Sequence, residues 1–207
     1  MSLVITNIFN FAGKCVSSIG TVRIPGGLSA LIVVLYACLS LHLHASVAEP
    51  EGYRLSNYDD LVPDGLSGAT TVSALQVLDL QQEKNAVVID VIPEHRKPEN
   101  LPEDQQWFPV PHLGIAGALW LPDVGYGVLS EKTEAYFTFH LEQASDNNAD
   151  YPLVFYCRIN CWMSWNAAKR ALSLGYRQVH WFSDGLEDWQ FEGFETQLLE
   201  PAAGERH

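Results

Sequence analysis

The segment that decides the fold runs from residue 153 to residue 172 and reads LVFYCRINCWMSWNAAKRAL. It opens with an unbroken apolar run, residues 153–156, which is typical of a strand buried on both faces of a parallel sheet. A helical pattern follows over residues 164–174, and Gly175 is placed to end it. A buried strand therefore delivers Cys157 to a short turn, and a helix begins soon after that turn.

Similar alternation extends along the chain in both directions. Ser73 is a candidate N-cap for a short helical face, and Ser130 is a candidate N-cap for a helix over residues 131–143. Strands that alternate with helices predict βαβ units, a parallel sheet and an α/β fold. The other predicted strands cover residues 70–72, 86–91, 118–121 and 179–182.

The regions around this pattern are irregular. Residues 49–69 are rich in Pro, Gly, Ser and Asp and predict an irregular N-terminal extension, and residues 196–207 are expected to form a tail. One domain is therefore predicted over residues 70–195. Within it, residues 93–111 hold five prolines and predict a long ordered loop over one end of the sheet, where Trp107 or Phe108 would contact the site.

The charge balance narrows the classes of partner. The 207 residues include 12 Lys plus Arg and 25 Asp plus Glu, which gives a formal net charge of -13. Nucleic acids and anionic membrane surfaces are held through Lys and Arg, so this surplus of acidic residues argues against both partners. The same field slows the approach of a small dianion.

The N-terminus predicts export. The first 48 residues contain no Asp or Glu, and a basic stretch with Lys14 and Arg23 precedes the apolar run of residues 28–41. Small residues at Ser46 and Ala48 then form a signal-peptidase site, so we expect a signal peptide over residues 1–48, cleavage after Ala48 and a periplasmic protein. A retained membrane anchor and a lipidated Cys38 are the alternatives.

Cleavage would leave Cys157 and Cys161 as the two remaining cysteines. A thiol between a strand end and a helix start faces backbone N–H groups and the positive end of the helix dipole, which favour the thiolate. The same geometry binds anions. Cys161 would either resolve an intermediate on Cys157 or lock the loop as a disulfide. No recognisable ligand spacing accompanies the pair, so no metal site is predicted.

Several landmarks together resemble those of the rhodanese domain over about residues 70–192. They cover residues 87–91, 115–122, 154–158, 174–179 and 184–189. The resemblance implies a rhodanese-like α/β fold with a five-stranded, mainly parallel sheet, and a persulfide on the cysteine that opens the active loop, which is Cys157 here. Many rhodaneses that use thiosulfate have a second basic residue near the loop end, whereas this loop has only Arg158.

A narrower resemblance, carried by residues 157–165 and the Pro-rich loop, is to the CXXCW motif proteins associated with PQQ-dependent catabolism. It implies a functional link to a PQQ-dependent dehydrogenase system. No residue argues for binding PQQ itself, so no cofactor is predicted. The candidate site residues are Cys157 and Cys161 as catalytic residues and five substrate-binding residues, namely Arg158, Ile159, Asn160, Trp162 and Asp90. His112 and His180 are interpreted as structural histidines.

The resulting hypothesis is a periplasmic rhodanese-like protein associated with PQQ-dependent alcohol catabolism. In it, Cys157 accepts sulfur as a thiolate and passes it to a thiol or cyanide-like acceptor, and the substrate is a small sulfur-containing or thiol compound. Two alternatives stay open. Cys157 and Cys161 could form a thiol–disulfide redox module, although three intervening residues depart from the Cys-x-x-Cys of thioredoxin-like proteins. The protein could also be a non-catalytic accessory of the dehydrogenase system.

Overall fold

The computed structural model describes residues 47–108 and 110–206. Residues 1–46, which hold almost all of the predicted signal peptide, lie outside the described part. None of the described helices is long and apolar enough to cross a bilayer. The elements are β1 (Thr70–Thr71), α2 (Ala74–Glu83), β2 (Val87–Asp90), β3 (His112–Ile115), β4 (Leu119–Trp120), α3 (Glu131–Ser145), β5 (Leu153–Tyr156), α4 (Trp162–Ser173), β6 (Val179–Phe182), α5 (Gly185–Phe191) and β7 (Thr196–Leu199).

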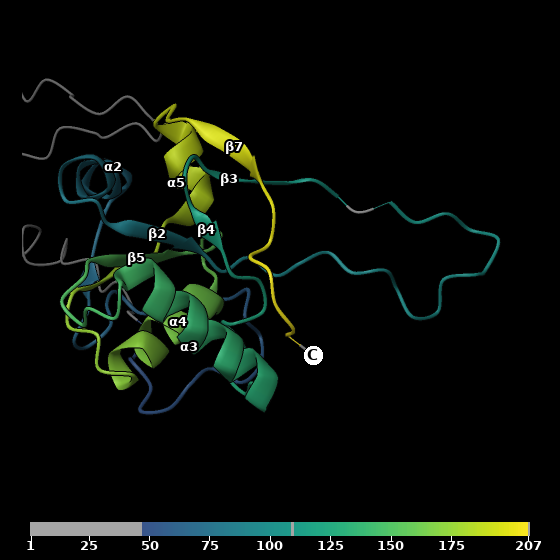
Figure 1. Ribbon diagram of the computed structural model, residues 1–207, viewed down its shortest axis with the longest axis horizontal. Helices are drawn as coiled ribbons and strands as arrows, with labels where there is room; N and C mark the ends of the chain where they lie inside the picture. The colour runs from purple at the N-terminus through teal and green to yellow at the C-terminus, as the bar shows by residue number, and fades with distance from the viewer. Residues whose placement is uncertain (1–46, 109, 207) are drawn as a thin grey trace, which may run out of the picture. The chain divides into compact units, whose positions relative to one another are not determined.

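Five strands form one parallel sheet in the order β1-β6-β5-β2-β4, so β5 lies at its centre. This confirms the α/β fold, and the sheet is parallel throughout. Helices α2 and α5 cover one face and α3 and α4 cover the other (Figure 1). Since successive side chains of a strand point to opposite faces, Phe155 packs toward α3 and α4 while Val154 and Tyr156 pack toward α2 and α5.

Local sequence signals account for the helix ends. The side-chain oxygen of Ser73 accepts a hydrogen bond from the Gln76 amide, and Gln76 reciprocates to form a capping box. Ser130 caps α3 through the Thr133 amide. Helix α4 ends before Gly175, whose φ of 95° is the left-handed conformation that glycine adopts most readily.

The N-terminal extension docks on α4. The Asn166 side chain accepts a hydrogen bond from the Arg54 amide and donates one to the Arg54 carbonyl, each at 2.9 Å. The buried Arg170 guanidinium lies 4.5 Å from the centre of the Tyr53 ring and donates to the carbonyls of Val124 and Tyr126. Irregular backbone is therefore held in place by side chains of a regular helix.

Residues 196–206 also pack against the body, although the sequence predicts a tail over residues 196–207. Strand β7 pairs antiparallel with β3 in a separate two-stranded sheet, and the Ala202 amide donates to the Trp120 carbonyl at 2.9 Å. The long segment 93–111 behaves differently from the expectation. Its described residues, 93–108 and 110–111, form a loop that extends away from the sheet instead of lying over it (Figure 1), and Phe108 is 72% exposed.

Candidate functional site

The active loop, residues 157–161, begins where the central strand β5 ends. The backbone of β5 is paired on both sides, with Tyr156 opposite Asp90 of β2 and Phe182 of β6. Cys157 is fully buried, and Cys161 is the N-cap of α4 and is 2% exposed. The sheet and the helix start therefore fix both ends of the loop.

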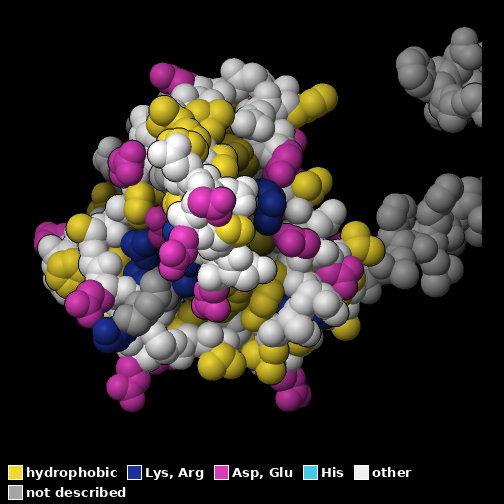
Figure 2. Space-filling model, turned by 90° about the vertical axis from the view of Figure 1, so that its right-hand side faces the viewer, with side chains coloured by type: hydrophobic (Ala, Val, Ile, Leu, Met, Phe, Trp, Pro, Cys, Tyr) yellow, Lys and Arg dark blue, Asp and Glu magenta, His cyan; other side chains and the backbone are white. Residues whose placement is uncertain are grey.

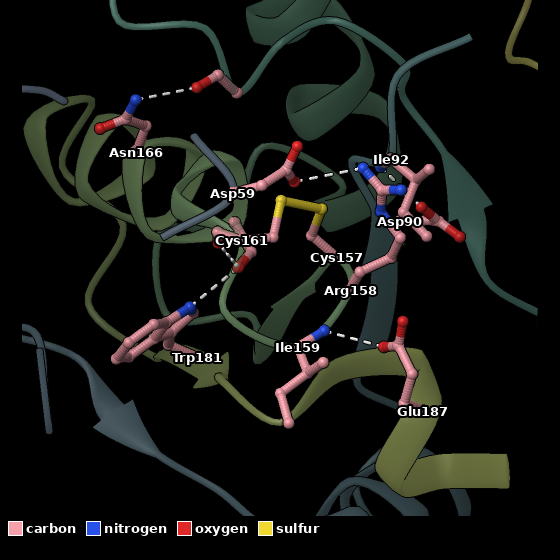
Figure 3. Close-up of a disulfide and its surroundings, with 12 residues drawn as sticks. Asp59, Asp90, Ile92, Cys157, Arg158, Ile159, Cys161, Asn166, Trp181 and Glu187 are labelled. Carbon is pink, nitrogen blue, oxygen red and sulfur yellow. Dashed lines mark hydrogen bonds and ion pairs between the residues drawn. A yellow bond between two sulfur atoms is a disulfide. The ribbon is translucent and has the colours of Figure 1, made fainter. Parts of the chain in front are cut away.

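Cys157 and Cys161 are joined by a disulfide, with their Cα atoms 6.0 Å apart (Figure 3). Asn160, which precedes Cys161, has a φ of 54°, the left-handed conformation that asparagine tolerates better than most residues. This residue turns the chain back so that Cys161 faces Cys157. The structure thus brings the two predicted catalytic residues into direct bonding distance.

Residues 58–61, which we call the strap, run along the active loop. Asp59 forms an antiparallel bridge with Cys161, and the Trp162 amide donates to the Tyr58 carbonyl at 2.8 Å. The Trp162 indole N–H donates to the Leu61 carbonyl at 3.0 Å. The bridge to Cys161 and two hydrogen bonds donated by Trp162 thereby hold the strap beside the active loop. The sequence alone assigned no role to these residues.

Two carboxylates contact the active loop from outside it. The Asp59 carboxylate accepts a hydrogen bond from the Arg158 guanidinium at 3.3 Å, and the Glu187 carboxylate accepts one from the Ile159 amide at 2.8 Å. The two carboxylates approach from different sides (Figure 3). The groups predicted to bind a substrate anion are therefore in contact with the protein's own anions.

Asp90 is buried in a hydrogen-bonded cluster beside the site. Its carboxylate accepts hydrogen bonds from the Tyr156 hydroxyl at 2.6 Å and the Ile92 amide at 2.8 Å, and it lies 2.8 Å from His112 Nε2. Burial, together with the Asp90 charge and its hydrogen bond, raises the pKa of Tyr156 well above its usual value. Gly114 is required here, since a Cβ would lie 2.8 Å from both the Asp90 carboxylate and the Tyr156 hydroxyl.

A pocket of about 210 Å³ opens next to the active loop. Its polar groups come from Arg158, Glu187, His95 and His112, and His112 stacks on Trp120 with ring centres 4.0 Å apart. The ends of the 93–111 segment line the same pocket, which is otherwise apolar. Cavities of this kind, with a few polar groups on apolar walls, suit small organic ligands.

The remaining predicted substrate-binding residues differ in exposure. Arg158 and Ile159 are exposed, and Asn160 is half-buried. Trp162 is 1% exposed and packs edge-on against Trp165, so its ring belongs to the core. Asp90 is also fully buried. Substrate contacts by these residues stay predictions. Among the described residues, no group of three or more His, Cys, Asp or Glu side chains could hold a metal ion.

Sequence reasoning missed Asp59 and Glu187. They lie 99 and 28 positions from their partners in the active loop, and acidic residues are common throughout this chain. The acidic composition of the chain was the one signal in the sequence for carboxylates in contact with the active loop. His112 was singled out, but its partner Asp90 could not be read from the sequence.

Comparisons with known proteins identify the family of the chain. The model of the rhodanese-like domain family matches residues 73–192, more than half of the chain. The comparison with curated proteins found no match. Among solved structures, a thiosulfate sulfurtransferase from Pseudomonas aeruginosa aligns at 13% identity and a TM-score of 0.43, covering 64% of this chain but only 21% of that one.

Two further solved structures illustrate the similarity. A polysulfide-sulfur transferase homodimer from Wolinella succinogenes aligns at 16% identity and a TM-score of 0.40 over 63% of this chain and 80% of its own. A human single-domain sulfurtransferase aligns at 24% identity and a TM-score of 0.37 over 60% of this chain and 97% of its own. The family model covers the active loop and four of the five strands of the parallel sheet, and the chain therefore belongs to the rhodanese-like domain family.

Proposed function

We propose that the protein transfers sulfur through Cys157 and that Cys161 completes the reaction. The observation that supports this most directly is the Cys157–Cys161 disulfide at the carboxyl end of the central strand. Membership of the rhodanese-like domain family supports this role, because the resemblance to rhodaneses implies that the first cysteine of the active loop accepts sulfur. The adjacent pocket would admit a small sulfur-containing or thiol substrate.

The first step would form a persulfide. The Cys157 thiolate attacks the sulfane sulfur of the donor, a new S–S bond forms, and the donor's own bond to that sulfur breaks. The donor leaves with the electron pair. The Arg158 guanidinium and the Ile159 amide are the loop groups suited to negative charge, but they contact Asp59 and Glu187, so a departing anion would have to compete with these carboxylates for them.

The second step would use Cys161. Its thiolate attacks Sγ of Cys157, the Sγ–Sγ bond forms, and the sulfane sulfur leaves as hydrosulfide with the electron pair. The two cysteines are oxidised to a disulfide and the sulfane sulfur is reduced. An external dithiol then reduces the disulfide and restores both thiols. The product of these two steps is the bond present in the structure.

Mass spectrometry of the reduced protein tests the first step. After incubation with sulfur donors, a Cys161→Ser variant should retain one extra sulfur on the peptide that contains Cys157, while the wild-type protein should release hydrosulfide and form the disulfide. Cys157→Ser is the matched control and should give neither product. The proposal fails if no donor leaves sulfur on Cys157 in the Cys161→Ser protein.

A thiol–disulfide redox module is the second candidate, and the same disulfide favours it. Both sulfur atoms are buried, which suits a structural bond as well as a protected redox centre. The reduction potential separates these cases, because structural disulfides lie below about -300 mV. A potential well above that value, with no persulfide from any donor, would favour the redox module over sulfur transfer.

We also propose, from the sequence, that the protein acts in the periplasm and in PQQ-dependent alcohol catabolism. The N-terminal pattern supports export. The cysteine pair followed by Trp162, together with the Pro-rich loop, resembles the CXXCW motif group, but three residues instead of two separate Cys157 from Cys161. N-terminal sequencing of the exported protein should begin at Glu49, and a start at Cys38 would contradict cleavage after Ala48.

The role in catabolism has its own test. A deletion strain should lose growth on alcohols, and a Cys157→Ser strain should lose it equally. Full growth of the Cys157→Ser strain would instead make the protein a non-catalytic accessory of a PQQ-dependent dehydrogenase system.

A further inference from the structure

The active loop meets two carboxylates that belong to the protein itself. Asp59 and Glu187 come from the strap and from α5, which lie far apart in the sequence, and each contacts a loop group suited to an anion. Asp59 pairs with the Arg158 guanidinium, and Glu187 accepts from the Ile159 amide. Both carboxylates are exposed, so bulk solvent and small solutes reach them.

The position of Glu187 is set by backbone contacts. The amide of Leu186, its neighbour, donates to the Cys157 carbonyl at 2.9 Å. Gly185 packs so closely that a Cβ there would lie 2.5 Å from the same carbonyl. The start of α5 is therefore seated on the cysteine that opens the loop, which directs Glu187 to the Ile159 amide.

The position of Asp59 is equally constrained. Its backbone bridges Cys161, and the neighbouring Tyr58 carbonyl accepts from the Trp162 amide. The side chain reaches Arg158 across the loop (Figure 3). Acidic side chains are spread over the face shown in Figure 2, and within the described part of the chain the hydrogen bonds of Asp59 and Glu187 connect carboxylates to the active loop.

We infer that Asp59 and Glu187 determine donor specificity by excluding anions from the active loop. This inference rests on the proposed sulfur transfer. An inorganic dianion such as thiosulfate would have to displace both carboxylates or approach Cys157 against their charge. The substrate class that fits is sulfane sulfur carried on an organic thiol, with no oxyanion next to the transferred sulfur. Its apolar part would contact the neighbouring pocket, which Ile92, Trp120 and Leu186 help to line.

Competitive alkylation of Cys157 measures this exclusion without any sulfur transfer. Iodoacetate is an anion and iodoacetamide is its neutral counterpart, and in both reactions the thiolate attacks carbon and iodide leaves. Reduced Cys161→Ser protein is treated with both reagents together, and mass spectrometry of the Cys157 peptide gives the ratio of the two adducts. Both reagents compete for the same thiolate, so changes in its pKa or accessibility cancel in the ratio.

The charge-removing variants Asp59→Asn and Glu187→Gln keep an oxygen that can accept the existing hydrogen bond. Each should raise the ratio of carboxymethyl to carbamidomethyl adduct about threefold, and both together about tenfold, with smaller effects at high salt. The matched controls are Asp60→Asn in the strap, whose carboxylate pairs with Arg54, and Glu192→Gln directly after α5. Both controls should leave the ratio nearly unchanged.

An unchanged ratio in the double variant, or an equal rise in the controls, would overturn the inference. With thiosulfate, the double variant should form the Cys157 persulfide faster than its parent by a larger factor than the alkylation ratio, because the donor carries two charges. A raised alkylation ratio together with no persulfide from any donor would support the charge exclusion and would reject the proposed sulfur transfer.

Discussion

The buried Asp90 cluster allows a quantitative prediction about stability. The Asp90 side chain is fully buried and satisfies three donors, from Tyr156, Ile92 and His112. Asp90→Ala removes all acceptors at once, and a buried donor without a partner costs about 1–3 kcal/mol. His112 is 13% exposed and can recover part of its loss from water. Asp90→Ala should therefore lower the free energy of unfolding by about 4 kcal/mol.

Asp90→Asn should cost less. One amide oxygen remains to accept from Tyr156 and His112, but the amide NH₂ then faces the Ile92 N–H, so one donor loses its acceptor. We expect a loss of about 2 kcal/mol. For a domain of this size, these losses should lower the melting temperature by roughly 5 °C in Asp90→Asn and roughly 10 °C in Asp90→Ala.

Urea unfolding followed by tryptophan fluorescence measures these values. Asp79→Asn on the exposed side of α2 is the control and should stay within about 0.5 kcal/mol of the wild type. Tyr156→Phe removes the hydroxyl donor that Asp90→Ala leaves without an acceptor, so the effects of these two changes should be non-additive by about 1 kcal/mol. A loss below about 1 kcal/mol for Asp90→Ala would refute the reasoning. If the Asp90→Ala protein were as stable as the wild type but had lost sulfur transfer, Asp90 would instead bind substrate, as the sequence predicts.

Three further perturbations have directions set by the structure. Gly185→Ala places a Cβ 2.5 Å from the Cys157 carbonyl at a φ of 66°, so it should cost about 3 kcal/mol and raise the proteolytic sensitivity of the active loop. Burial, and to a lesser extent Lys84, lowers the pKa of His180 below 6.5, so the unfolded state binds more protons than the folded state in acid. The melting temperature of the wild-type protein should therefore fall as the pH drops below 6.5, and that of His180→Asn should fall less. An equal fall in the wild type and the variant would assign the acid sensitivity to other groups. The disulfide closes a loop with a sequence separation of 4, so its reduction should lower the free energy of unfolding of the wild-type protein by about 2 kcal/mol. The Cys161→Ser protein lacks this bond, so adding reductant should not lower its stability further. Calorimetry with and without reductant checks this value, and a loss near zero would mean that the bond adds no stability.

Much of the sheet could be predicted because its strands are short apolar runs bounded by turn residues or helix caps. The runs at residues 153–156 and 179–182 form β5 and β6 with those bounds. Ser73 and Ser130 cap helices as expected, since a cap depends on a few neighbouring residues. Helix α4 begins at Trp162, two residues before the predicted start, because the buried indoles of Trp162 and Trp165 continue the helical face.

Strands β3 and β7 escaped prediction because their pattern is weak. Two of the four residues in β7 are exposed and two are not, and Leu113 opposite Leu198 gives an exposed apolar pair. Such strands are stabilised by their partner rather than by their own sequence pattern. The 93–111 segment is a related case, because its composition indicates a loop and contains no information about the direction in which the loop extends.

The sequence by itself determined the position of Cys157, since a buried strand followed by a helix start is encoded within residues 153–172. It also placed Cys161, Arg158 and Asp90 near the carboxyl edge of the sheet. Only the tertiary structure decided what surrounds the thiol: a bond to Cys161, a strap that carries Asp59, a helix that carries Glu187, and a hydrogen-bonded cluster that buries Asp90. The physical reason is that strand and helix formation depend on neighbouring residues, whereas these contacts join groups brought together by burial of the shared core.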